Sequence, residues 1–288
     1  MGAEVVVITG AGSGIGWGCA EALARDGATV VAGVLDDAQA QWVAQQGLEG
    51  VHPIPLDVTS ADQIESAVER TEQIAAGRPI VGLVNNAGIA VAGPLEYLSD
   101  ADLRLQFDVN VLGLMAVTRA FLPALRRSRG RIINVGSVGG RLSIPFTGPY
   151  NASKFAVRAL SDALRVELRP SGIKVVLIEP GPIDTPIWQR SMDAAIERLD
   201  RLPAQARERY RVEIDTLFEM TRKTAAAAIG VQTVVDAIVE AVYAKRPPTS
   251  RLLGVQAYVQ AAASVLPDRL RDRVLMAVMG LPSRRDEE

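Results

Sequence analysis

A glycine-rich turn near the N-terminus lies between a short run of β-branched residues and a helical stretch. The run covers residues 4–9, the turn reads TGAGSGIG over residues 9–16, and Ala- and Leu-rich sequence follows. Glycines let the backbone turn sharply and approach a pyrophosphate, and the next helix offers free N–H groups and its positive dipole end. This order predicts a dinucleotide-binding unit. The expected contacts within the turn are Gly10, Ser13, Gly14, Ile15 and Gly16.

The alternation of apolar runs with helical patterns continues to about residue 185. The runs cover residues 28–34, 51–58, 80–88, 131–135 and 173–178. Short connections and right-handed crossovers give one parallel sheet with helices on both faces. We therefore predict an α/β fold with a doubly wound, Rossmann-type sheet, in one domain over residues 1–288.

Residues at the carboxyl ends of these runs are candidate cofactor contacts, because ligands of open parallel sheets bind there. They are Leu35, Asp36, Asp57, Val58, Asn86, Ala87, Gly88, Pro180, Gly181, Ile183 and Thr185. Asp36 stands about where an acid holds the adenosine ribose in such folds. No Lys or Arg occurs between Thr29 and Gly50 to pair with a 2′-phosphate. We therefore predict NAD as the cofactor in preference to NADP, although Asp36 and Asp37 can equally be solvated turn residues.

Tyr150 and Lys154 are the central pair of candidate catalytic residues. They stand four apart on a predicted helix, so they share one face. A free Tyr has a pKa of about 10, and a fixed cation nearby lowers it. Ser137 follows a predicted strand and can bring a hydroxyl to the same place. Asn110 interrupts the helix predicted over residues 99–127, where an amide can bind a water or relax the helix.

Composition restricts the other classes of function. The 288 residues carry 31 Lys and Arg against 33 Asp and Glu, and this balance gives no reason to expect nucleic acid as a partner. Cys19 is the only cysteine, which excludes an intrachain disulfide and fits a reducing, cytoplasmic location. His52 is the only histidine and has no companion ligands, so we expect no metal. The uncharged stretch 252–267 is too short to span a bilayer.

The last third is expected to close and extend the domain. Amphipathic pieces broken by Pro203 predict a substrate lid over residues 186–222, and residues 245–288 form a C-terminal extension. The side chains expected to face the substrate are Ile187, Trp188, Met192, Ile196 and Leu199. Those expected to face solvent are Arg190, Arg198 and Arg201. A wall without cations favours an apolar substrate.

Together these motifs resemble the short-chain dehydrogenase/reductase family. The resemblance covers roughly residues 4–185 and rests on the motif TG-x-x-x-G-x-G, on NNAG at 85–88, and on Asn110, Ser137, the Y-x-x-x-K pair and the PG…T stretch. The segments GLVNNAGIAVAGPLEYL and GRIINVGSVGGRLS are similar to the branch of retinol and hydroxysteroid dehydrogenases. Two features depart from the pattern. Val34 stands where the family usually has an acid, and the tail lacks long hydrophobic anchors.

The resemblance implies a role for each catalytic candidate. Tyr150 would exchange a proton with the substrate oxygen, and Ser137 would hold that oxygen. Lys154 would lower the pKa of Tyr150 and hold the nicotinamide ribose, while Asn110 would hold a water linked to Lys154. The implied activity is hydride transfer between NAD and a secondary alcohol or ketone, with an apolar steroid- or retinoid-like skeleton favoured by the lid.

Two alternatives stay open at this point. One is an NADPH-dependent carbonyl or 3-oxoacyl reductase, and the other is a non-catalytic NAD-binding regulator. The resemblance also implies a homodimer or homotetramer, paired through the helices predicted over residues 99–127 and 150–170. The side chains expected between subunits are Phe121, Leu122, Leu160 or Leu164.

Overall fold

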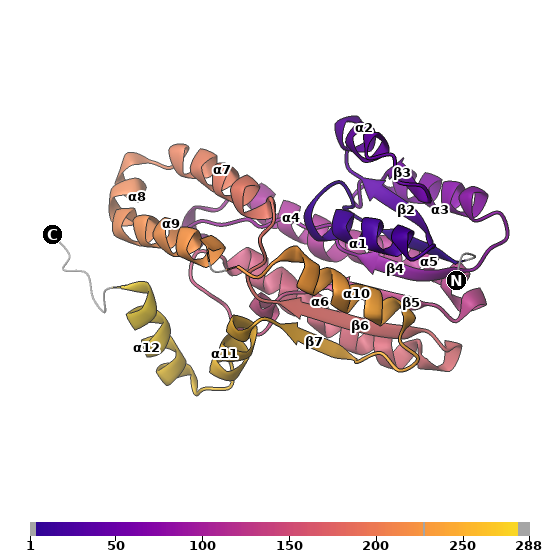
Figure 1. Ribbon diagram of the computed structural model, residues 1–288. Coiled ribbons are helices and arrows are strands. Elements are labelled where there is room, and N and C mark those ends of the chain that lie inside the picture. The colour runs from indigo at the N-terminus through magenta and orange to yellow at the C-terminus, as the bar shows by residue number, and fades with distance from the viewer. Residues whose placement is uncertain (1–3, 227, 282–288) are drawn as a thin grey trace.

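One parallel sheet organises the chain (Figure 1). The computed structural model describes residues 4–226 and 228–281, and within them seven strands follow the order β3-β2-β1-β4-β5-β6-β7, every neighbouring pair parallel. The strands are β1 Val5–Ile8, β2 Thr29–Val34, β3 Val51–Pro55, β4 Ile80–Asn85, β5 Arg131–Val135, β6 Lys174–Pro180 and β7 Ser250–Leu253. The predicted doubly wound α/β sheet is confirmed.

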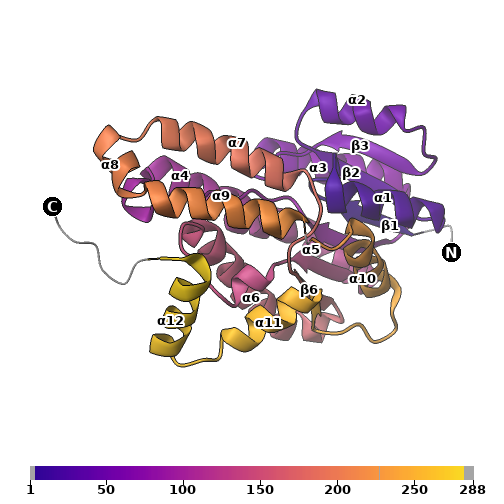
Figure 2. The same ribbon diagram turned by 60° about the vertical axis from the view of Figure 1, so that its left-hand side comes forward.

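Helices cover both faces of this sheet (Figure 2). The first face packs against α1 Gly14–Arg25, α2 Asp37–Gln45 and α10 Val231–Tyr243. The second packs against α3 Ala61–Ala75, α5 Leu114–Ser128 and α6 Gly148–Glu167. The other helices are α4 Asp100–Phe107, α7 Ile187–Asp200, α8 Ala204–Arg209, α9 Arg211–Ala226, α11 Val255–Ala263 and α12 Asp268–Met279. Short 3₁₀ turns are η1 Leu95–Tyr97, η3 Val138–Gly140 and η4 Arg169–Ser171.

Strand β1 shows why the apolar runs become central strands. Successive side chains of a strand point to opposite faces, so a strand covered on both faces must be apolar throughout. Val6 and Ile8 join the core under α1 and α10, whereas Val5 and Val7 join the core under α3 and α5. All four are fully buried.

The strand order reverses between β1 and β4. The chain runs outward through β2 and β3, then returns to place β4 on the other side of β1. The connections after β1 and β4 therefore leave in opposite directions, and a crevice opens between them at the carboxyl ends of the strands. This reversal puts the glycine turn and the Asn86–Gly88 segment beside each other.

The helix predicted over residues 99–127 is interrupted at the expected place. It begins with a capping box in which Ser99 and Asp102 bond each other's backbone. A π-helical segment, η2 Asp108–Gly113, then separates α4 from α5 and contains the buried Asn110. Such insertions often occur at functional sites.

The continuous helical stretch Asp100–Ser128 is long and apolar enough to cross a membrane by length and composition alone. Half of its most apolar window is buried, and Val117, Phe121 and Leu125 lie completely inside the domain. We interpret it as a core helix.

Burial of Phe121 and Leu164 also corrects the predicted subunit contact. Both side chains pack in the core beside α3 and α5, so they are not left for a second subunit. Leu122 and Leu160 are half-buried. The homodimer or homotetramer itself stays a prediction.

Segment 187–226 folds as the three helices α7, α8 and α9, which stand together at one end of the molecule (Figure 1). Met192 and Leu199 are half-buried, whereas Ile196 is 44% exposed, so its predicted inward position is wrong. Arg201 lies on the solvent side as expected. The side chains of Ile187, Trp188 and Arg190 lie outside the described part of the structure.

Arg198 differs most from the prediction, because it points inward rather than to solvent. Its Nε donates a 2.6 Å hydrogen bond to Oδ1 of Asp102, the residue that also caps α4. The two side chains are only 18% and 24% exposed. This ion pair ties α7 to the start of α4.

We expect Arg198→Gln to loosen α7 from the domain. A half-buried ion pair of this kind contributes about 1 kcal/mol, so local opening should increase roughly fivefold. Limited proteolysis of segment 187–226 measures this opening. Arg201→Gln is the matched control, because Arg201 is 77% exposed and lies 3.7 Å from Glu197. Equal proteolysis rates in the two variants would contradict the role of the Arg198–Asp102 ion pair in holding α7 to the domain.

Candidate functional site

A cavity of about 410 Å³ opens at the reversal of strand order. Its lining contains most of the candidate residues, drawn from the carboxyl ends of the six strands β1 to β6 and from α6. They are Gly10, Ser13, Gly14, Ile15, Leu35, Asp57, Val58, Asn86, Ala87, Gly88, Ser137, Tyr150, Lys154, Pro180, Gly181, Ile183 and Thr185. Gly16, Asp36 and Asn110 are candidates that do not line it.

The glycine turn has little room for side chains. Gly10 and Gly14 have φ of +65° and +55°, in the left-handed region that favours glycine. A Cβ on Gly16 would lie 2.2 Å from the backbone oxygen of Gly10. Gly16 therefore serves the packing of α1 against the turn rather than direct contact with a ligand.

Thr9 locks this turn to the segment after β4. Its Oγ1 accepts hydrogen bonds of 3.0 Å from the backbone N–H groups of both Asn86 and Ala87. In return, Nδ2 of Asn86 donates to the backbone oxygens of Thr9 and Gly10 at 3.1 and 3.0 Å. These four bonds hold the two sides of the crevice at a fixed separation.

Asp36 is the N-cap residue of α2, a role that was not predicted for it. Its Oδ1 accepts a 2.8 Å hydrogen bond from the backbone N–H of Gln39, so it opens α2 and is neither the expected ribose contact nor a solvated turn residue. Its Oδ2 accepts from Nε2 of Gln39 at 3.3 Å. Gln39 lines the cavity in place of Asp36, with its side chain beside Gly12.

Asp57 lies on the cavity wall after β3. Its Oδ1 accepts hydrogen bonds from the backbone and hydroxyl of Thr59 at 2.8 and 2.7 Å. Its own N–H donates to Oε1 of Gln63 at 2.8 Å. The carboxylate is thus oriented by the first residues of the turn into α3.

Ser137, Tyr150 and Lys154 come together on the opposite wall. Ser137 begins η3, where its Oγ accepts a 3.0 Å hydrogen bond from the N–H of Gly139, and it also bonds the phenol of Tyr150. Nζ of Lys154 donates to the backbone oxygen of Val135 at 2.9 Å and lies 5.8 Å from the centre of the Tyr150 ring.

Burial dominates the acidity of both groups on α6. It raises the pKa of Tyr150 above its usual value, while the hydrogen bond with Ser137 acts to lower it. It also lowers the pKa of Lys154 to about 8. The lowering of the Tyr150 pKa expected from the sequence is therefore not found in the protein alone, because desolvation penalises the phenolate more than Ser137 stabilises it.

Asn110 supports the site from behind the cavity. Its Oδ1 accepts from the N–H of Ile89 at 2.9 Å, and its Nδ2 donates to the backbone oxygen of Ile89 and to Oγ of Ser153, both at 3.0 Å. Ser153 in turn donates to the backbone oxygen of Tyr150 at 2.7 Å. The Asn110 side chain thus links the loop after β4 to the first turns of α6.

The segment after β6 closes the cavity beside the glycine turn. Ile183 forms a parallel bridge with Ile229, and the side chain of Thr185 lies 3.4 Å from the position that a Cβ on Gly14 would occupy. Candidate contacts from β1 and β6 are therefore neighbours, although they are far apart in sequence.

Gln39 and Ser153 belong to the site but were missed from the sequence. Gln39 follows Asp36 by three residues, which is capping-box spacing, so the cap was detectable. Ser153 lies within the Y-x-x-x-K stretch, but nothing in its pattern singles out its bond to Asn110. Among the residues that the structure describes, no group of three or more His, Cys, Asp or Glu could hold a metal ion.

Comparison with known proteins agrees with this arrangement. The model of the short chain dehydrogenase family matches residues 4–195. The chain is 33% identical to 17-beta-hydroxysteroid dehydrogenase type 6 of Bos taurus over 94% of this chain and 87% of that protein. It is 32% identical to retinol dehydrogenase 5 of Mus musculus over 97% of this chain and 90% of that protein.

Other relatives include reductases. An NADPH-dependent 3-dehydrocapnine reductase of Ornithobacterium rhinotracheale is 31% identical over 93% of this chain and 94% of that protein. A solved short chain dehydrogenase/reductase from Burkholderia phymatum in complex with NAD has a TM-score of 0.75 at 26% identity, covering 99% of this chain and 98% of that one. The chain therefore belongs to the short-chain dehydrogenase/reductase family and is an oxidoreductase that acts on CH–OH groups with NAD(P).

Proposed function

We propose that the protein is an NAD-dependent dehydrogenase of apolar secondary alcohols, steroid- or retinoid-like in size, and that it also reduces the matching ketones. The observation that carries this proposal is the convergence of Ser137, Tyr150 and Lys154 on a cavity whose other wall is a glycine turn. A cytoplasmic location stays a prediction.

The cavity fits a dinucleotide at both ends. At the glycine turn, the N-cap residue Ser13 makes no side-chain hydrogen bond to the start of α1, so the first N–H groups of the helix are available to a pyrophosphate. Pro180, Gly181, Ile183 and Thr185 would hold the nicotinamide end, and Asn86, Ala87 and Gly88 would contact its ribose. Asp57 and Val58 would contact the adenine. When bound, the cofactor supplies the hydride exchange and, in its oxidised form, a positive ring.

Each catalytic candidate then has a distinct task. Ser137 holds the substrate oxygen through its hydroxyl, and Tyr150 moves a proton between its Oη and that oxygen. Lys154 holds the ribose hydroxyls and presents its ammonium to Tyr150, which favours the phenolate against the burial penalty described above. Asn110 fixes the helix geometry behind these residues. We also propose that it binds a water molecule that is linked to Lys154.

NAD is favoured because none of the described residues that line the adenosine end is a cation that could pair with a 2′-phosphate. Leu35 and Gln39 line that end, and the acid Asp36 lies next to it. Of the described residues that line the cavity, only Lys154, at the far end, carries a positive charge. The apolar side chains that line the cavity include Ile89, Val109 and Pro186. Burying an apolar skeleton there stabilises the complex by about 25 cal/mol per Å².

A second candidate is NADPH-dependent reduction of a carbonyl compound. The 3-dehydrocapnine reductase, which matches this chain along almost its whole length, supports it. The other alternative, a non-catalytic NAD-binding regulator, does not agree with the membership of an oxidoreductase family or with the complete set of Ser137, Tyr150 and Lys154.

Tyr150→Phe should abolish turnover, because it removes the group that exchanges the proton. NADH affinity should stay within about threefold, since the ring remains in place. Lys154→Ala should lower both the rate and the affinity, because we assign it two tasks. Stopped-flow rates and fluorescence titration with NADH measure the two quantities. Substantial activity in Tyr150→Phe would refute its role.

The wild-type protein should show a higher kcat/KM with NAD than with NADP. Leu35→Arg should shift this ratio towards NADP by at least about tenfold, because a guanidinium at the cavity edge can pair with a 2′-phosphate. Val166→Arg controls for an added charge, since Val166 is 68% exposed on α6. A wild-type preference for NADP would favour the reductase alternative.

A panel of alcohols tests the substrate class with NAD, followed by NADH absorbance. Steroid- and retinoid-sized secondary alcohols should have KM values at least about a hundredfold below that of 2-propanol, because they bury far more apolar surface. A preference for small, charged hydroxy acids would overturn the apolar assignment.

A further inference from the structure

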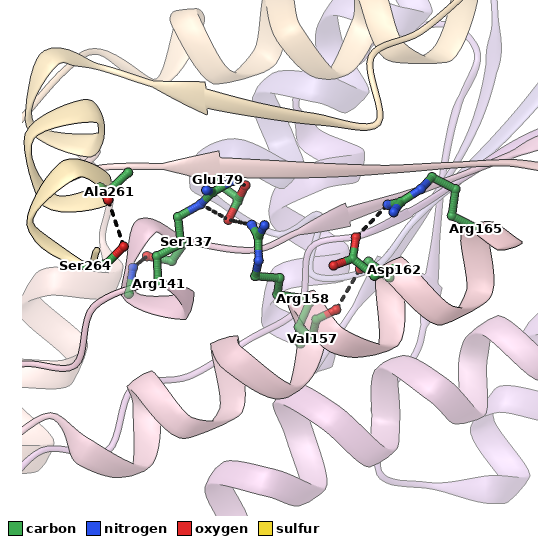
Figure 3. A network of polar contacts seen from close by, with 11 residues as sticks. Ser137, Arg141, Val157, Arg158, Asp162, Arg165, Glu179, Ala261 and Ser264 are labelled. Carbon is green, nitrogen blue, oxygen red and sulfur yellow. Dashed lines mark hydrogen bonds and ion pairs between the residues drawn. The ribbon is translucent and has the colours of Figure 1, made fainter. Parts of the chain in front are cut away.

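A buried ion cluster joins three elements of the active site (Figure 3). Glu179 is 1% exposed, and its two carboxylate oxygens accept hydrogen bonds from Nε and Nη2 of Arg141 at 2.8 and 2.6 Å. Nη1 of Arg158 donates to Oε1 of Glu179 at 2.7 Å. The three side chains make up what we name the Glu179 clamp.

Each member of the clamp lies close in sequence to a residue of the proposed reaction. Arg141 ends η3, the turn that begins at Ser137. Arg158 stands on α6 one turn after Lys154 and two turns after Tyr150. Glu179 directly precedes the Pro180–Gly181 segment of the cavity wall. The clamp therefore fixes the relative positions of the Ser137 turn, the Tyr150 helix and the wall.

The direction of the Glu179 side chain follows from the strand. Val175 packs in the core on the α6 side of the sheet, and alternate residues of a strand share a face. Glu179 thus lies on the face of β6 that carries α6, where an apolar residue would be ordinary. A carboxylate there is tolerated because two guanidinium groups bond both of its oxygens.

Tight packing transmits the position of Arg141 to Ser137. The backbone of η3 is closed by hydrogen bonds of 2.9 Å from Gly140 to Ser137 and from Arg141 to Val138. A Cβ on Gly140 would lie 2.6 Å from the backbone oxygen of Lys154. Because η3 contacts α6 this closely at Gly140, we expect a displacement of Arg141 to shift the turn relative to the helix.

We propose that Glu179 is a positioning residue, which acts through Arg141 to hold the hydroxyl of Ser137 against the phenol of Tyr150. This role rests on the proposed alcohol dehydrogenase function. The clamp acts on geometry alone, since none of its members lines the cavity around Tyr150.

Hydrogen exchange tests the clamp without any substrate. In Glu179→Gln the carboxylate charge is lost at nearly constant size, and the two guanidinium groups are left facing a neutral amide. Backbone amides of residues 136–142 should then exchange at least about tenfold faster than in the wild type, because η3 loses its anchor. Glu72→Gln is the matched control: Glu72 is a carboxylate on α3 that pairs with Arg127 at 2.8 Å but is 52% exposed. In the control variant, the backbone amides of residues 136–142 should exchange as fast as in the wild type.

Kinetics test the link to Ser137 with the best alcohol of the panel. Glu179→Gln should lower kcat roughly ten- to a hundredfold with KM within about threefold, as expected for a small misplacement of a reacting group. In a Ser137→Ala background the same substitution should have little further effect on kcat, because the hydroxyl that it positions is already gone. Glu179→Asp keeps the carboxylate, so its kcat should lie between those of Glu179→Gln and the wild type.

The possible failures are distinguishable. No turnover by the wild type on any alcohol or ketone would defeat the proposed function, while hydrogen exchange would still decide whether the clamp anchors η3. Unchanged exchange in Glu179→Gln, or equal loss of kcat with and without Ser137, would overturn the positioning role. If Glu179→Gln does not fold, Arg158→Gln removes one hydrogen bond of the clamp at a side chain that is 31% exposed. Amide exchange of residues 136–142 should then rise, and kcat should fall, by smaller factors than those expected for Glu179→Gln.

Discussion

The reversal of strand order between β1 and β4 is the constraint on which the site depends. Two connections that leave in opposite directions cannot cover the carboxyl ends of these strands, so a cavity remains there. Thr9 and Asn86 bridge it with reciprocal hydrogen bonds, which set its width. The glycine turn can then reach a pyrophosphate on one side, while α6 presents Tyr150 and Lys154 from the other.

Buried polar bonds hold α5 and α6 in register with the sheet. Asn85 donates to both Thr118 on α5 and Asn134 on β5, and Asn134 donates to Ser161 on α6, each at 2.9 Å. Apolar packing alone tolerates sliding, whereas buried hydrogen bonds between specific partners favour one arrangement. The Tyr150 helix thus has polar anchors along its length.

The sequence predicted the strands well because β-branched runs between glycines have few other solutions. The role of Asp36 was harder to predict, since the same carboxylate suits a ribose contact or a helix cap. The hydrogen bond from the N–H of Gln39 shows that Asp36 is the cap. The inward turn of Arg198 could not be predicted, because its partner Asp102 lies far away in sequence. The Tyr150 pKa depends on burial, which a spacing of four residues does not report.

We expect the cavity to bring a nicotinamide beside Tyr150 and Ser137. A crystal structure of the protein with NADH tests it most directly. The adenosine should lie beside Leu35 and Gln39, the pyrophosphate at the N-terminus of α1, and the nicotinamide between Thr185 and Tyr150. A nicotinamide outside hydrogen-bonding reach of the segment after β6, or a dinucleotide bound elsewhere, would contradict it.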